Sequence, residues 1–285
     1  MMKASNTAEV LRKPLSIIYA NLRRVKIDPI SFPWIESPAI ESWEAARQEL
    51  LYLGALKDDE TLTELGNCVS DLEVDPGISS MIFKACKLGL GECAVDLSGI
   101  LSVVNSIFLK GNKNEHEAAR ECHSKFFSPQ GDIHTFYNVY CSWKALKIEE
   151  ETNLQKSDNK EEKIMPLTRL AKWCKDNYLD NKSLGIAFTT AEELRLSLKN
   201  TYASIWNKKG QKRVPRAGEI TQLIISNLNM NVAYRINDSS YMTLVTSVIA
   251  DIHPNSCLIN HKKKTQLPPF IVYHGILKTS GTFLS

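Results

Sequence analysis

The chain has 285 residues, of which 43% are hydrophobic and 24% are charged, and its formal net charge is only +3. This composition is ordinary for a globular protein, so any attraction to phosphate groups must come from local clusters of basic residues. The sequence contains no run of about 18 apolar residues that would predict a membrane span, and its first residues lack the apolar core of a signal peptide.

A repeating apolar spacing predicts that the chain begins with helices. The first helix face is formed by Leu11, Leu15, Ile18, Leu22 and Val25. Ser37 is expected to cap a second helix and Gly54 to terminate it. Its inward-facing side chains should be Ile40, Trp43, Leu50 and Leu51. Thr63 is expected to cap a short third helix after an acidic turn, and together these elements predict a winged-helix domain over residues 1–74.

Residues 75–215 carry further helical signals and predict a helical bundle. Asp75 is expected to cap its first helix and Gly89 to close it. The segment "ECAVDLSGILSVVNSIF" is apolar on nearly every face, which predicts a buried central helix. A later helix should begin with Asp132 as its cap. Its aromatic side chains at helical spacing are Phe136, Tyr140 and Trp143. Residues 147–163 are polar and dense in both charges, which predicts a solvated loop.

The pattern changes after about Arg216. One more helix leads into the β-branched and aromatic runs "NVAYRI", "YMTLVTSVIADI" and "PFIVYHGIL", which turn signals separate. Short strands at the end of a helical chain predict a small β-barrel, with an OB-fold over residues 216–285 as the leading candidate. The predicted fold class is therefore mainly α with a C-terminal β-barrel.

Catalytic and metal-binding motifs are missing from the sequence. No phosphate loop is present. The segment "HEAARECH" fails the zinc-helix pattern, because Arg120 stands where the second histidine ligand should be. The seven cysteines form no Cys-x-x-Cys pair, which predicts reduced, mostly buried thiols in a nuclear or cytoplasmic, intracellular protein. We therefore predict no catalytic residue, no metal site and no activity for this chain alone.

A basic run is the first candidate for binding nucleic acid. Its cations are Lys199, Lys208, Lys209, Lys212, Arg213 and Arg216, and no acidic residue lies among them. Tyr202 and Trp206 interleave with these cations. Cations beside aromatic rings suit single-stranded nucleic acid, which needs neutralised phosphates and stacking faces. The alternative is a solvated helix end followed by a basic loop, and charge alone leaves both interpretations open.

Polar corners of the predicted barrel are the second candidate. Short hydroxyl and amide side chains there can bind phosphate, sugar or base; they are Asn255, Ser256, Thr279 and Ser280. Nearby charge comes from Lys262, Lys263, Lys264 and Lys278. His253, at the same turn, is a further candidate for RNA binding, and it fits a turn-packing role better than acid–base chemistry. Asp132 and His134 fit a helix cap and a first-turn residue, or alternatively the wall of a nucleic-acid channel.

Four stretches together resemble the C-terminal region of DEAH-box RNA helicases. They are the segment "LLYLGALKDDETLTELG", the helix in "GDIHTFYNVYCSWKAL", the stretch "AKWCKDNYLDNKSLGIAFTTAEELRLSL" and the end of the chain from "IADIHPNSC" to "LKTSG". "NVAYRI" is similar to the large plant-type members. The resemblance implies a winged helix, a ratchet-like bundle and an OB-fold that clamp single-stranded RNA against two RecA-like ATPase domains.

The resemblance also implies ligands and partner proteins, some of which would bind parts of a helicase outside this chain. ATP and Mg would belong to the missing helicase core, and an activator protein would dock on the winged helix or the OB-fold. Asn255 stands where the family commonly has serine, and it keeps a polar group there. The chain stops at "TFLS", before the family's usual final strand, so the resemblance implies an incomplete barrel. Two rivals stay open: a protein-interaction module that has lost RNA binding, and a piece of a complete helicase.

Overall fold

The computed structural model describes residues 14–156, 166–206, 213–228, 230–259, 267–278 and 281–284. Its contacts divide the chain into two compact units. Unit 1 holds residues 1–91 and 197–213, and unit 2 holds residues 92–196 and 214–285. The predicted three-domain organisation stays a prediction. Within the described ranges, no helix combines the length and apolar character that crossing a membrane requires.

Unit 1 is built from short helices whose ends follow local sequence signals. They are α1 (Leu15–Arg24), α2 (Ile40–Leu53), α3 (Glu64–Leu72), α4 (Pro76–Lys87) and α10 (Ala203–Trp206). The Thr63 hydroxyl accepts a hydrogen bond from the Gly66 N–H at 3.2 Å, and the Asp75 carboxylate accepts from the Gly77 N–H at 2.9 Å. Gly54 ends α2 with a φ of 75°, a left-handed conformation that favours glycine. These predicted caps are confirmed.

The predicted start of α2 is wrong. The helix begins at Ile40 with Ala39 as its cap residue, and no side chain caps it. The hydroxyl of Ser37 instead donates to the carbonyl of Pro38. Because the helix begins later than expected, Ile40 lies in its exposed first turn and is 65% exposed. Trp43 and Leu50 are buried, as predicted.

The helical part of unit 2 surrounds an aromatic core. Its α-helices are α5 (Gly91–Leu101), α6 (His116–Ser124), α7 (Asp132–Lys156), α8 (Pro166–Asp176), α9 (Asn181–Thr201) and α11 (Ala217–Asn227), with short 3-10 turns η2 (Val104–Ser106) and η3 (Lys113–Glu115). α5 is buried along nearly its whole length, as predicted. Tyr140 and Trp143 are buried, and Phe136 packs against the same cluster. The aromatic face of α7 therefore belongs to the core.

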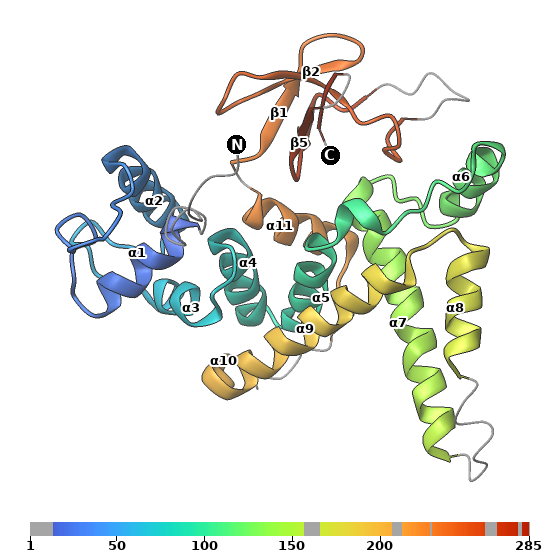
Figure 1. Ribbon diagram of the computed structural model, residues 1–285, viewed down its shortest axis with the longest axis horizontal. Coiled ribbons are helices and arrows are strands. Elements are labelled where there is room, and N and C mark those ends of the chain that lie inside the picture. The colour runs from blue at the N-terminus through green and yellow to red at the C-terminus, as the bar shows by residue number, and fades with distance from the viewer. Residues whose placement is uncertain are drawn as a thin grey trace. The chain divides into compact units, whose positions relative to one another are not determined.

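The charged segment after residue 147 is largely helical, so its prediction as a loop is wrong up to Lys156. Glutamate, lysine and glutamine are strong helix formers, and Lys147 pairs with Glu151 one turn later at 2.6 Å. α7 and α8 run side by side in opposite directions (Figure 1), and Arg169 of α8 pairs with Glu149 at 3.3 Å. Residues 157–163 of the predicted loop lie outside the described residues.

The C-terminal sheet has OB-type strands but is not a closed barrel. Its strands are β1 (Val232–Arg235), β2 (Ser240–Thr243), β3 (Ile249–Ile252), β4 (Phe270–Val272), β5 (Ile276–Lys278) and β6 (Thr282–Leu284). The order is β4-β1-β2-β3-β6-β5, with β3 and β6 parallel and the other pairs antiparallel. A buried face that includes Ala233, Tyr241 and Leu284 forms its core.

The predicted β-barrel is not closed, because the two edges of the sheet are not paired with each other in the described residues. β4 and β5 are consecutive in the chain and form the two edges, and only residues 273–275 join them. At that point the Tyr273 N–H donates to the Asn231 carbonyl at 3.0 Å, which extends the pairing of β4 with β1 by one residue. In the described residues the edges therefore meet through the chain and not through strand pairing.

Candidate nucleic-acid interface

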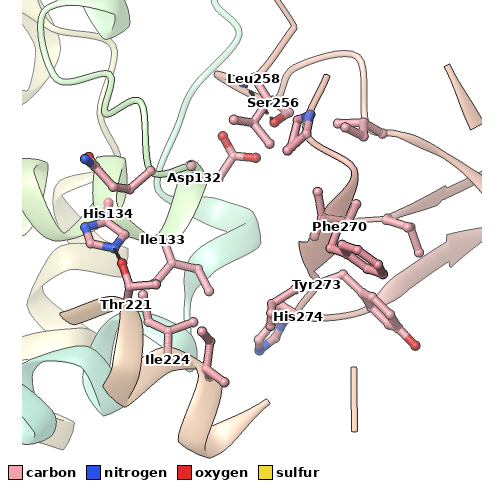
Figure 2. Close-up of a pocket in the computed structure, with 18 of the residues that line it drawn as sticks. Asp132, Ile133, His134, Thr221, Ile224, Ser256, Leu258, Phe270, Tyr273 and His274 are labelled. Atoms are coloured by element: carbon pink, nitrogen blue, oxygen red, sulfur yellow. Dashed lines mark hydrogen bonds between the residues drawn. The ribbon is translucent and has the colours of Figure 1, made fainter. Parts of the chain in front are cut away.

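A cavity of about 420 Å³ in unit 2 lies between the start of α7, the helix α11 and the sheet. Figure 2 shows Ile133 and Ile224 projecting from the helices, with Phe270 and Tyr273 on the sheet side. The wall is mainly apolar, and polar groups lie at a few points along it. A concave apolar surface with a few placed polar groups is the usual form of a ligand site.

Asp132 holds α7 against the loop that follows β3. The sequence predicted Asp132 as the cap of α7, and this prediction is wrong, because Asp132 is the first residue of the helix. The cap position belongs to Gly131, whose carbonyl accepts the first helical hydrogen bond, from the Thr135 N–H, and whose φ of 114° favours glycine. The Asp132 carboxylate is thereby available to accept from the Cys257 N–H at 2.7 Å.

His134 joins α7 to α11. Its side chain is buried, and Nε2 lies 3.0 Å from the Thr221 hydroxyl of α11 (Figure 2). Burial lowers the pKa of His134, because the protonated ring would lose its hydration. The ring lines the cavity as a neutral hydrogen-bonding group, with little positive charge to offer a phosphate.

Polar side chains of the turn after β3 form hydrogen bonds within the turn itself. His253 Nδ1 accepts from the Asn255 N–H at 3.2 Å, and its ring stands edge-on to Phe283. Ser256 is buried, lines the cavity and accepts from the Leu258 N–H at 3.2 Å. Asn255 is exposed. Of these three predicted residues, Asn255 therefore presents its side chain to solvent most fully.

Comparisons with known proteins identify the two parts of this architecture. A model of the helicase associated domain (HA2), winged-helix, matches residues 46–74, and a model of the oligonucleotide/oligosaccharide-binding (OB)-fold matches residues 220–285. The pre-mRNA-splicing factor ATP-dependent RNA helicase prp22 of Schizosaccharomyces pombe is 26% identical over 285 residues, which cover 99% of this chain. The resemblance to the C-terminal region of DEAH-box RNA helicases is confirmed. The chain spans 22% of the length of that relative.

The described structure brings together only some of the predicted site residues. Asp132, His134 and Ser256 line one cavity, and Lys278 is exposed on β5. Lys208, Lys209, Lys212, Thr279 and Ser280 lie outside the described residues, as do Lys262, Lys263 and Lys264. Arg213 is exposed and belongs to unit 1. The role of each in binding RNA stays a prediction.

The aromatic residues of the basic run do not offer stacking faces. Trp206 is only 4% exposed, so its interpretation as a base-stacking residue is wrong. Tyr202 is partly buried, and its hydroxyl donates to Asp71 at 2.7 Å. The apolar indole packs into unit 1 because burial of its large ring outweighs any gain from facing water.

The helicase-type OB sheet instead exposes an aromatic residue that sequence reasoning missed. Phe270 opens β4 at the edge of the sheet, lines the cavity and is 62% exposed. Its sequence signal is weak: an aromatic residue after two prolines at the start of a strand fits a packed position equally well. The strand pairing of Phe270 with Tyr234, which no local pattern predicts, places it beside the cavity.

The described residues offer little to covalent or metal chemistry. They contain no cluster of histidine, cysteine or carboxylate side chains that suits a metal ion. Burial raises the pKa of four thiols to about 12, so they are protonated and poor nucleophiles at neutral pH; they are Cys68, Cys93, Cys174 and Cys257.

Proposed function

We propose that this chain is the C-terminal accessory region of a DEAH-box RNA helicase, which binds single-stranded RNA and assists unwinding by an ATPase core outside this chain. ATP and Mg would bind that core. The observation that carries the proposal is the helicase-type winged helix and OB-type sheet in one chain, with an exposed aromatic residue beside a cavity of the sheet. OB-folds commonly bind single strands on such surfaces.

The relative's printed name supports an RNA-processing setting. It is called a pre-mRNA-splicing factor, so we propose single-stranded RNA as the partner and a nuclear or cytoplasmic, intracellular location for this chain. A helicase core and an activator protein on the winged helix or OB-fold are further proposed partners. The competing function is a protein-interaction module that docks partner proteins and does not bind RNA. The small net charge of +3 supports this alternative.

Salt dependence of RNA binding tests the proposed function. The full chain should bind a labelled oligouridine, and filter binding should show about tenfold weaker affinity when the salt concentration rises about two- to threefold, as expected for about four neutralised phosphates. Counterion release from RNA is the cause of this steep dependence. Absence of binding at low salt would favour the protein-interaction module.

Charge reversal within the basic run is expected to weaken RNA binding. The variant Lys212→Glu with Arg213→Glu should lose about tenfold in affinity, because it removes two phosphate contacts and adds repulsion. The matched control is Lys110→Glu with Lys113→Glu, which changes the net charge equally at two exposed positions and should bind nearly normally. Both variants should keep the circular dichroism spectrum of the parent. Equal losses in the two variants would exclude the basic run as a specific contact.

A further inference from the structure

The cavity beside β4 has the size and surface of a site for a flat, partly polar group. Its volume of about 420 Å³ falls in the range of small-ligand pockets, about 300–1,000 Å³. Apolar side chains from three elements form its walls, among them Ile133 of α7, Ile224 of α11 and Ile271 of β4. Such walls favour an occupant with two apolar faces, and exclude a phosphate group, which needs charge or donors on several sides.

Phe270 supplies a stacking surface at this cavity. More than half of its surface is exposed, although the ring is large and apolar, and it belongs to a sheet edge that matches the OB-fold. Proteins that bind single strands use exposed aromatic rings in OB-folds to stack unpaired bases. Phe270 and the apolar walls therefore suit opposite faces of the same planar ring.

Asp132 supplies a polar group of a definite kind. Asp132 lines the cavity, and its carboxylate interacts with both the backbone N–H and the thiol of Cys257. An ionised carboxylate has about four acceptor sites, so it can accept further hydrogen bonds from a ligand. A negative acceptor repels phosphate but suits the exocyclic amino group of cytosine or adenine.

We propose that this cavity binds one unstacked nucleobase of single-stranded RNA, with the base stacked on Phe270 and its exocyclic amino group donating to Asp132. The inference rests on the proposed function, because it places one nucleotide of the RNA strand. It adds a base-reading site to a region otherwise expected to hold the backbone. The site should prefer bases with an amino group over uracil.

Abasic scanning of a bound RNA tests the proposal. The full chain is titrated with labelled decamers of cytidine in which a single abasic residue occupies each position in turn. One position should show a loss of about tenfold in affinity, which is within the range of one base–aromatic stack. Phe270→Ala should lose about as much with the intact decamer, and should show no further loss with the decamer abasic at that position.

Two further variants separate the contributions. Ile249→Ala removes an apolar side chain of the same sheet that is 58% exposed and lies outside the cavity lining, so it should bind the decamers normally. Asp132→Asn retains an oxygen that accepts from Cys257, but loses charge, and should reduce the preference for cytidine over uridine decamers.

The outcomes distinguish this proposal from the function on which it rests. If RNA binds with the expected salt dependence but neither an abasic residue nor Phe270→Ala changes affinity, the base site is wrong and the accessory function stands; an apolar peptide side chain would then be the better occupant. If the full chain binds no RNA, both proposals fail.

Discussion

Replacing Asp96 with alanine should lower the free energy of unfolding of unit 2 by about 3 kcal/mol, because Lys144 loses its carboxylate partner in a largely buried network, while Arg195 keeps Glu92 and Glu192. Asp96 is only 6% exposed, and both of its oxygens accept from Lys144 Nζ, at 2.8 and 2.7 Å. Arg195, which is equally buried, approaches the same carboxylate at 3.3 Å. The loss should appear as a lower urea midpoint by circular dichroism.

Two controls test whether burial is the cause. Glu149→Ala breaks the exposed pair with Arg169, and it should cost about 0–1 kcal/mol, as surface pairs do. Asp96→Asn keeps an acceptor and the shape of the side chain, so it should fall between the two. Hydrogen exchange should assign the loss to α5, α7 and α9, which supply the network. If Asp96→Ala unfolds no more easily than Glu149→Ala, the network is not a stabilising element.

Features set by neighbouring residues were predictable from the sequence. Thr63 and Asp75 cap the helices that follow them, because each side chain bonds to an N–H two or three residues away. Ser37 has the same chemistry, yet the helix begins three residues later at Ile40. Cap-forming residues therefore indicate a helix start, while the surrounding contacts decide which candidate is used.

Polarity alone was a poor guide to the charged segment. Residues 147–156 contain almost no apolar side chain that would mark a helix face, so hydrophobic periodicity does not predict a helix there. The helix continues because α8 lies alongside and charged pairs form within and between the two helices. A mixed-charge segment next to an established helix can extend it without forming a core.

The candidate site depends on contacts between distant residues, and the sequence predicts these least well. Asp132 and Cys257 are separated by 125 positions and meet in one hydrogen bond. The network of Asp96, Lys144 and Arg195 spans up to 99 positions. No spacing rule links such residues, so predictions reached the polar turn but missed Phe270 and this network.

The same two helices that carry Asp96 and Arg195 also approach each other at a buried glycine. A side-chain carbon built on Gly99 of α5 would lie 2.1 Å from the carbonyl oxygen of Ala187 in α9. That atom belongs to the backbone, so it cannot rotate away as a flexible side chain would. Gly185 of α9 provides the matched case, because a side-chain carbon there would meet nothing within 4 Å.

We therefore expect opposite signs for the same substitution at these two helical positions. Gly99→Ala should lower the free energy of unfolding by about 2–3 kcal/mol, because overpacking forces the helices apart. Gly185→Ala should raise it by about 0.5–1 kcal/mol, since alanine restricts the unfolded chain and clashes with nothing. Urea unfolding of both variants measures the difference. If both Gly99→Ala and Gly185→Ala stabilise the protein, α5 and α9 do not approach each other as closely at Gly99 as described. That result would also count against the buried network of Asp96 and Arg195 beside it.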